Sequence, residues 1–303
     1  MTNVLLTGAN GFVGQTLVAR MRYAPEFRLL ATSASKSLQP DADPDAFKQM
    51  DITDPDQVQT VFAGFRPDIV IHCAAMTQAD PCELNPELCD RVNIEGTRLV
   101  AKAAEACSAG FVYLSTDFVF DGLKGPYREE DTPNPVSTYG WSKLQGEFIT
   151  QSLSVPWAIV RTILVYGLTP GMSRGNLVTW VHGSLLKQTP IRVVDDQFRM
   201  PTLVDDLADG IITLIQRKKW GIFHLSGPEM TSVYEFARTT ARFFQLDEAL
   251  ITPIKSAELN QPGRRPVSTG FVLDKAMEEL GFTPRSLIQG LGLVRNLLDD
   301  SSG

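Results

Sequence analysis

The stretch Val4-Leu5-Leu6-Thr7-Gly8-Ala9-Asn10-Gly11-Phe12-Val13-Gly14 decides the fold of this 303-residue chain. A short apolar run is followed directly by glycines at positions 8, 11 and 14. Glycines at such spacing let the chain turn tightly after a strand, approach a pyrophosphate closely and pack the next helix on the sheet. The start of that helix offers free N–H groups and a favourable dipole to phosphates. The stretch therefore predicts a strand–turn–helix unit with a dinucleotide cofactor held around Gly8, Asn10, Gly11, Phe12, Val13 and Gly14.

Beyond this unit, short apolar runs alternate with amphipathic stretches, which is typical of repeated βα units. Consecutive crossovers of this kind place helices on both faces of a parallel sheet. The predicted fold class is therefore α/β, with a doubly wound parallel sheet of the Rossmann type. Further strands are expected at 28–31, 47–50, 68–72, 111–114 and 157–163, and helices at 12–21, 55–65, 84–107 and 139–153.

After Gly167 the regular alternation of short apolar runs and amphipathic stretches ends, which indicates a second, smaller part of the chain. We predict a dinucleotide-binding Rossmann domain over residues 1–167, which a strand near 220–226 rejoins. Residues 168–303 are expected to form mostly a substrate-binding lobe. This C-terminal lobe should interleave with the first domain rather than separate cleanly from it.

Composition and charge exclude several classes of partner. The net charge of −7 argues against nucleic acid, because neutralising phosphates needs a basic face. No signal peptide precedes the first strand and no apolar run approaches transmembrane length, so we expect a cytoplasmic chain with no membrane partner. The four cysteines form no C-x-x-C pair, and we expect reduced thiols and no metal site. A homodimer stays open as an alternative to a monomer.

A second motif, Tyr139-x-x-x-Lys143, lies in the helix expected after the fifth strand. Its spacing puts a phenol and an ammonium on one helix face. Hydride addition to a carbonyl leaves an oxyanion that needs a proton, and a tyrosine with a pKa of about 10 is a poor partner near neutral pH. The lysine favours the phenolate, lowers that pKa and can also bind ribose hydroxyls. Beside a dinucleotide loop, this motif predicts an oxidoreductase acting on a carbonyl or an alcohol.

The third catalytic group is expected at the end of the fifth strand, where Ser115-Thr116-Asp117 lies. A hydroxyl there can hold the substrate oxygen during transfer of both hydride and proton. From the residues alone, Ser115 and Thr116 are both candidates.

The end of the second strand bears on the choice between NAD and NADP. An acidic residue that grips the ribose 2′-OH should close this strand, but the chain reads Ala31-Thr32-Ser33-Ala34-Ser35-Lys36 there. With no carboxylate in this stretch, a 2′-phosphate meets no repulsion, and Ser33 and Lys36 are its expected partners. We therefore predict NADPH as the cofactor, with NADH as the alternative.

The G-x-x-G-x-x-G spacing resembles that of the extended short-chain dehydrogenases/reductases. Asp51-Ile52-Thr53 is similar to their adenine-contacting turn, although a simple turn carboxylate explains Asp51 equally well. Cys73-Ala74-Ala75 resembles the element under their cofactor, and Asn93 their helix-kink asparagine. Aligning Val119-Phe120 with their Val-Tyr pair puts Thr116 on the catalytic Ser/Thr. The resemblance thus implies a catalytic set of Thr116, Tyr139 and Lys143, the last two also contacting the cofactor.

A narrower resemblance, to the dTDP-4-dehydrorhamnose reductases, runs nearly end to end. It implies NAD(P)H-dependent reduction of a 4-keto group on a nucleotide-linked deoxysugar, with the nucleotide diphosphate in the C-terminal lobe. The segments that carry it are Ser115-Thr-Asp-Phe-Val-Phe-Asp-Gly122, Tyr139-Gly-Trp-Ser-Lys-Leu-Gln-Gly-Glu147, Arg161-Thr162 with Val165-Tyr166-Gly167, Asp196-Gln197 with Pro201-Thr202, and Arg265-Pro266.

The same resemblance suggests substrate contacts. Arg199, Arg264 and Arg265 are candidates for the diphosphate, because a guanidinium fork suits phosphate. A surface ion pair is the alternative for each of them. Asn176 looks like an asparagine contact of the reductases. The expected substrate-binding residues are Asp117, Phe118, Asn176, Arg199 and Arg265.

Two other functions stay open. A nucleotide-sugar epimerase or dehydratase of the same superfamily would keep NAD bound through its cycle and use Asp117 as an extra acid or base. A non-catalytic, cofactor-binding regulatory subunit would keep the fold without turnover. Phe118 and Arg199 stand where the reductases usually carry tyrosine and glycine, so the identity of the sugar is not fixed by the motifs.

Overall fold

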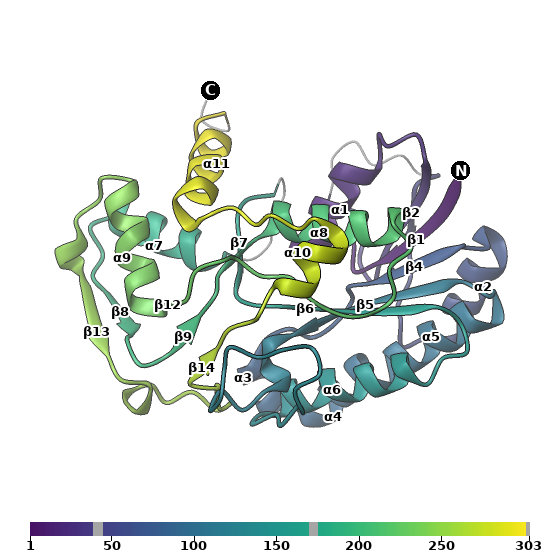
Figure 1. Ribbon diagram of the computed structural model, residues 1–303, viewed down its shortest axis with the longest axis horizontal. Helices are drawn as coiled ribbons and strands as arrows, with labels where there is room; N and C mark the ends of the chain where they lie inside the picture. Colours follow the sequence, from purple (N-terminus) through teal and green to yellow (C-terminus); the bar gives the residue numbers. More distant parts are fainter. Residues whose placement is uncertain (39–44, 170–174, 301–303) are drawn as a thin grey trace.

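The computed structural model describes residues 1–38, 45–169 and 175–300 (Figure 1). Its centre is a seven-stranded sheet in the order β11-β6-β5-β4-β1-β2-β3, with every neighbouring pair parallel. The order reverses between β1 and β4, which is where a doubly wound sheet binds its ligand. The predicted Rossmann-type sheet is thus confirmed. Its strands are β1 (Thr2–Thr7), β2 (Phe27–Ser33), β3 (Phe47–Gln49), β4 (Ile69–His72), β5 (Gly110–Thr116), β6 (Trp157–Thr162) and β11 (Gly221–His224).

Helices cover both faces of this sheet (Figure 1). One face packs on α1 (Phe12–Met21), α8 (Val204–Gln216) and α10 (Asp274–Leu280), and the other on α2 (Pro55–Phe65), α5 (Thr97–Ala106) and α6 (Thr138–Gln151). Alternate side chains of a strand point to opposite faces. In β1, Leu6 therefore joins the first core and Leu5 the second. This burial on both faces explains why the strands read as continuous apolar runs.

The helix expected over 84–107 is broken up in the structure. Its region contains the end of α3 (Ala79–Leu84), α4 (Pro86–Asp90), the π-helical turn η1 (Arg91–Gly96) and α5. Pro86 begins α4 because proline suits the first turn of a helix. The π-helical turn carries Asn93, whose side chain bonds to Ser142 of α6.

The rest of the chain forms a lobe beside the carboxyl ends of the sheet strands (Figure 1). Within it, β9 pairs with β12 and β14, β8 with β13, and β10 with β7. Because α8, β11 and α10 return to the sheet, the C-terminal lobe is assembled from several separate stretches. Its elements are β7 (Val165–Tyr166), α7 (Leu177–Leu186), β8 (Ile191–Val194), β9 (Phe198–Arg199), β10 (Thr202–Leu203), β12 (Thr231–Ser232), α9 (Val233–Phe243), β13 (Ile251–Ile254), β14 (Ser268–Thr269), α11 (Leu287–Asp300) and the 3₁₀ turns η3 (Glu248–Leu250) and η4 (Ser256–Glu258). A further 3₁₀ turn, η2 (Asp117–Val119), directly follows β5 of the sheet.

No helix among the described residues is long and apolar enough to cross a membrane. Within the same residues, no group of three His, Cys, Asp or Glu side chains is placed to hold a metal ion. All four cysteines are free thiols.

Candidate active site

The cofactor loop, residues 8–14, folds closely on itself and on the segment after β4, so its glycines leave no room for side chains. Gly8 has a φ of +75°, and a Cβ there would lie 2.6 Å from the backbone nitrogen of Ala74. A Cβ on Gly14 would lie 2.2 Å from the carbonyl oxygen of Gly8. The N-cap residue of α1 is Gly11, which has no side chain to satisfy the first N–H groups of the helix, and a helix start of this kind suits an anion. These features fit the pyrophosphate of a dinucleotide.

The end of β2 is held against this loop by Asn10. Its amide nitrogen donates to the hydroxyl of Ser35 at 2.9 Å and to the carbonyl of Lys36 at 2.8 Å, while its amide oxygen accepts from the N–H of Leu38 at 3.0 Å. Ser33 closes β2, and the side chain of Lys36 is exposed. Hydroxyls and one ammonium therefore border the expected position of the ribose 2′-phosphate, and no carboxylate lies between Ser33 and Leu38.

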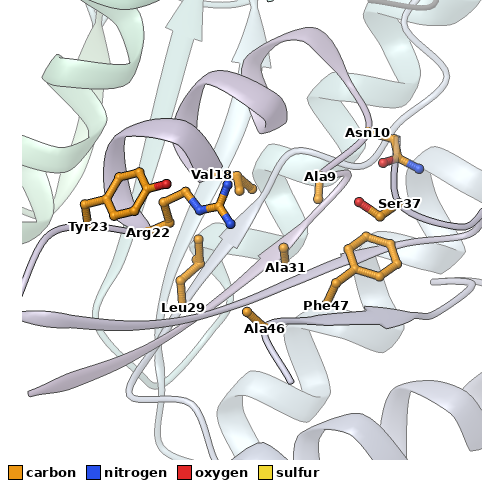
Figure 2. A pocket seen from close by; sticks show the side chains of 10 residues that line it. All are labelled: Ala9, Asn10, Val18, Arg22, Tyr23, Leu29, Ala31, Ser37, Ala46 and Phe47. Carbon is orange, nitrogen blue, oxygen red and sulfur yellow. The ribbon is translucent and has the colours of Figure 1, made fainter. Parts of the chain in front are cut away.

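A cavity of about 270 Å³ lies between α1 and the β2–β3 edge of the sheet (Figure 2). Asn10 and Ser37 stand at one end, next to the cofactor loop, and Arg22 and Tyr23 at the other. Its floor is apolar, from β2 and β3. The cavity does not include Tyr139, so it adjoins the cofactor side of the site rather than the reacting centre.

Beneath the loop, a buried hydrogen-bond chain joins β1 to the start of α5 through His72. The Thr7 hydroxyl lies 2.7 Å from Nδ1 of His72, and the Thr97 hydroxyl 3.0 Å from Nε2. Burial, with a smaller effect of Lys143, lowers the pKa of His72 to about 3, so the ring is neutral at neutral pH. His72 was not among the predicted site residues, although a histidine at the end of an apolar strand indicates a buried polar partner.

Cys73, Ala74 and Ala75 follow β4 and line the floor beside Gly8. The N–H of Cys73 bonds to the carbonyl of Thr7, and that of Ala74 to the Thr7 hydroxyl at 3.3 Å. Burial raises the pKa of Cys73 to about 12, so it is a neutral thiol. The segment is thus fixed at the distance from the loop that Gly8 allows.

Asn93 ties this floor to the catalytic helix. Its amide oxygen accepts from the N–H of Met76 at 2.7 Å, and its amide nitrogen donates to the carbonyl of Met76 at 3.0 Å and to the hydroxyl of Ser142 at 2.9 Å. A π-helical turn is a common way to direct a side chain at a functional site. Ser142, which the sequence analysis also missed, lies three residues after Tyr139 on the same helix.

Asp51 and Ile52 have local structural contacts. The carboxylate of Asp51 accepts from both the N–H and the hydroxyl of Thr53 at 2.8 Å, which closes a turn. Ile52 is buried against Gly96. These contacts match the turn interpretation of Asp51 and leave its adenine role a prediction.

Tyr139, Lys143 and Thr116 come together at the carboxyl end of β5, and all three are buried. Burial raises the pKa of Tyr139 above its usual range, while the neighbouring Thr116 hydroxyl opposes that rise. Burial lowers the pKa of Lys143 to about 8, and Cys73 and Glu147 oppose this effect. Burial, rather than the expected effect of the lysine, therefore dominates the phenol, which keeps its proton at neutral pH.

Ser115 and Thr116 point to different partners. The Ser115 hydroxyl donates to Glu147 at 2.6 Å, and Glu147 forms a fully buried ion pair with Arg161 at 2.7 Å. The Thr116 hydroxyl instead lies beside Tyr139. This arrangement favours Thr116 over Ser115 as the third catalytic group. The sequence did carry a signal for the ion pair, because Arg161 is a charge inside an apolar strand.

Arg199 has different partners from those expected. Its Nη1 donates to the carbonyls of Phe198 at 2.7 Å and Val267 at 3.2 Å, and Nη2 to that of Pro266 at 2.7 Å. Its Nε lies 3.7 Å from Oδ2 of Asp117. With 4% of its surface exposed, Arg199 is committed to the protein interior, which argues against the expected diphosphate contact.

Phe118 follows the catalytic hydroxyl and packs against the proton donor. Its ring meets that of Tyr139 edge-on at 5.6 Å, and the guanidinium of Arg199 lies 5.9 Å from its centre. Phe118 is therefore placed beside the reacting centre, where its sequence position suggested a sugar contact.

The other expected substrate residues also have protein partners. Arg265 forms a two-pronged ion pair with Asp80 of α3, at 2.6 and 2.7 Å. The amide of Asn176 caps α7 by accepting from the N–H groups of Val178 and Thr179, and it donates to the carbonyl of Gly167. Arg264 is exposed. Of these residues, Arg264 has the most accessible side chain for a diphosphate.

Comparison with known proteins covers nearly the whole chain. The profile of the family described as RmlD substrate binding domain matches residues 1–298. The chain is 30% identical over 308 residues to a dTDP-4-dehydrorhamnose reductase of Aggregatibacter actinomycetemcomitans, with 97% of this chain and 99% of that protein covered. It is 31% identical over 256 residues to methionine adenosyltransferase 2 subunit beta of Bos taurus, with 83% and 75% covered.

Among solved structures, the chain is similar to dTDP-4-dehydrorhamnose reductase from Bacillus anthracis str. Ames in complex with NADP. The TM-score is 0.82 at 30% identity, and 98% of this chain and 99% of that one are covered. The likeness therefore includes both the sheet and the C-terminal lobe.

Proposed function

Because the chain belongs to the family described as RmlD substrate binding domain, we propose that it reduces a 4-keto group on a nucleotide-linked deoxysugar with NADPH. It is an oxidoreductase of the short-chain dehydrogenase/reductase type. The observation that carries this proposal is the cluster of Thr116, Tyr139 and Lys143 beside the cofactor loop. A dinucleotide held by that loop can deliver hydride at the place where a protonated phenol is buried.

The reaction needs a hydride and a proton on opposite ends of the carbonyl bond. When bound, NADPH supplies the hydride to the carbonyl carbon. Tyr139 donates its phenolic proton to the carbonyl oxygen as negative charge develops there. Lys143, with a pKa of about 8, is mostly cationic at neutral pH and stabilises the phenolate that remains. The Thr116 hydroxyl, which lies beside the phenol, keeps Tyr139 directed at the carbonyl oxygen.

The proposed binding residues form two groups, one for the cofactor and one for the substrate, on either side of the switch point of the sheet. Gly8, Gly11 and Gly14 hold the pyrophosphate, and Ser33 and Lys36 hold the ribose phosphate, for which the absence of a carboxylate between residues 33 and 38 is the support. On the substrate side, Phe118 and Asp117 border the sugar and Arg264 and Arg265 its diphosphate. The last two assignments rest on charge and position, since Arg265 already pairs with Asp80.

The function is tested by following NADPH oxidation with a panel of nucleotide-linked 4-keto sugars. The panel should include dTDP-4-dehydrorhamnose, its UDP counterpart and a 4-keto sugar without a nucleotide. We expect turnover on at least one nucleotide-linked member and none on the free sugar. Absence of NADPH oxidation on the whole panel would reject the reductase function.

A second candidate function is that of a non-catalytic subunit, favoured by the similarity to methionine adenosyltransferase 2 subunit beta. The presence of Tyr139, Lys143 and Thr116 in one buried cluster supports catalysis instead. Both functions require a bound dinucleotide, so cofactor affinity does not separate them. Stable association with a second enzyme, together with failure on the sugar panel, would favour the subunit.

A homodimer is proposed through the outer face of α6. Trp141 and Phe148 lie two turns apart on this helix, and each exposes about half of its side chain, 52% and 50%. Leu88 of the neighbouring α4 is also exposed. Large exposed apolar groups that gather on one face are typical of protein contacts. Sedimentation of wild type and Trp141→Glu tests this, with a shift to monomer expected for the variant.

A further inference from the structure

Asp117 connects the C-terminal lobe to the catalytic cluster. Its Oδ1 accepts a hydrogen bond from the Thr116 hydroxyl at 3.0 Å. Its Oδ2 accepts from the hydroxyl of Thr269 in β14 and lies 3.7 Å from Nε of Arg199 in β9. The phenol of Tyr139 faces the same carboxylate from α6. Asp117 is thus a buried carboxyl group with one cation, two hydroxyls and one phenol around it.

The protonation state of Asp117 determines to which neighbour the Thr116 hydroxyl donates its proton. A hydroxyl has one proton to donate and two lone pairs that accept. The Thr116 proton is donated to Asp117, and its oxygen accepts from the N–H of Phe118 at 3.2 Å and faces Tyr139. While Asp117 is ionised, Thr116 therefore acts only as an acceptor towards the phenol, which keeps Tyr139 as the proton donor.

We propose that Arg199 is a positioning residue of this reductase, which holds Asp117 ionised so that Thr116 orients the proton donor Tyr139. The inference rests on the proposed function. Arg199 is fixed for this task by its bonds to the carbonyls of Phe198, Pro266 and Val267, which keep the guanidinium from turning to a ligand.

Removing the Arg199 charge exchanges donor and acceptor in the hydrogen bonds that connect Asp117, Thr116 and Tyr139. Burial already raises the pKa of Asp117, and Arg199 is the main opposing influence, followed by Thr269 and Thr116. Arg265 adds positive charge behind Arg199. Without Arg199 the carboxyl takes up a proton and donates it towards Thr116. The Thr116 proton then turns to the phenol oxygen, and Tyr139 loses the acceptor that orients it.

The test is the pH profile of kcat with NADPH and dTDP-4-dehydrorhamnose, or the panel member that proves active. In Arg199→Met, the loss of activity on the acid side should begin about 1–3 pH units higher than in wild type, the usual effect of one close opposite charge on a carboxyl pKa. Arg199→Lys should restore most of the wild-type profile. In an Asp117→Asn background, Arg199→Met should change the level of activity but not the shape of the profile. Any other set of profiles overturns the proposal.

Two further measurements guard against a variant that fails to fold. Thr269→Val removes a hydrogen bond to Asp117 at constant volume and should shift the acid limb in the same direction by a smaller amount. The melting temperature of Arg199→Met should recover relative to wild type as pH falls, because a raised folded-state pKa stabilises the protonated form. This recovery should vanish with Asp117→Asn. Turnover by wild type with unchanged variant profiles defeats only this inference, whereas no wild-type turnover defeats the proposed function.

Discussion

The cofactor loop, residues 8–14, and the 263–269 segment both border the catalytic cluster, yet they are held by different means. The loop depends on its own backbone, since Gly8 and Gly14 admit no Cβ without a clash. The 263–269 segment is held by side chains from distant parts of the chain, including the Asp80–Arg265 ion pair across 185 positions. The comparison teaches that a site built locally can be read from spacing, whereas one built by distant pairs cannot.

The largest effect is expected on catalysis, from substitution of Tyr139 in the catalytic cluster that both regions border. Tyr139→Phe should lower kcat by about 10²–10⁴-fold, because it removes the general acid. NADPH affinity, measured by fluorescence titration, should change little. Tyr166→Phe, which removes another buried hydroxyl, is the matched control and should keep its turnover. Wild-type turnover in Tyr139→Phe would show that another group donates the proton.

The second-largest effect is expected on stability, from loss of the buried ion pair between Glu147 of the catalytic helix and Arg161. Glu147→Gln leaves Arg161 buried without its charge partner, which costs about 3–5 kcal/mol of unfolding free energy. We expect a melting temperature lower by roughly 10 °C. Glu258→Gln breaks the exposed pair with Arg192 and should have almost no effect. Equal losses in both variants would contradict the structural role given to the buried pair.

The pH dependence of stability tests the floor of the cofactor loop. The folded-state pKa of His72 is about 3, below its ordinary value of 6.5, so the unfolded chain binds more protons. The contribution of His72 is therefore fully present above pH 6.5 and is lost as pH falls towards 3. Each pKa unit corresponds to about 1.4 kcal/mol. In urea titrations, His72→Gln should show a shallower loss of stability over this window, and an unchanged slope would refute the assignment.

Substitution of Gly14 tests whether the cofactor loop depends on its own backbone rather than on contacts with distant side chains. Gly14→Ala should cost about 1–3 kcal/mol because its Cβ meets the Gly8 carbonyl, and it should weaken NADPH binding. Gly183→Ala in α7 is the control, since among the described residues no atom outside its own helix backbone lies within 4 Å of the added Cβ. Calorimetry and cofactor titration on the two variants measure this difference. Similar behaviour of both would remove the distinction drawn for the loop.

The smallest effect is expected in the 263–269 segment. Arg265→Met breaks a partly exposed ion pair, which contributes about 1 kcal/mol or less. We expect the KM for the sugar nucleotide to rise while the NADPH affinity stays unchanged. Arg192→Met, on a more exposed pair, should leave both unchanged. A loss of NADPH affinity in Arg265→Met would mean that the segment serves the cofactor side.

The same contrast explains how far the sequence could predict the molecule. The Rossmann sheet and the proximity of Tyr139 and Lys143 followed from periodicity and from short spacings. The interior role of Arg199 did not, because its partners Asp117, Pro266 and Val267 are brought near it only by tertiary packing. Asn176 illustrates the same limit, since a helix cap and a ligand contact use the same amide. Sequence patterns thus name the groups available, and only the fold shows how those groups are used.

The central claim is that hydride passes from the nicotinamide to the C4 carbonyl of a nucleotide-linked sugar. It is tested most directly with NADPH deuterated at the transferred position and dTDP-4-dehydrorhamnose, followed by mass spectrometry and NMR of the product. The account predicts one deuterium on C4 of the sugar for each NADPH oxidised. Conversion of the sugar without net NADPH oxidation, or a product with no deuterium at C4, would contradict it.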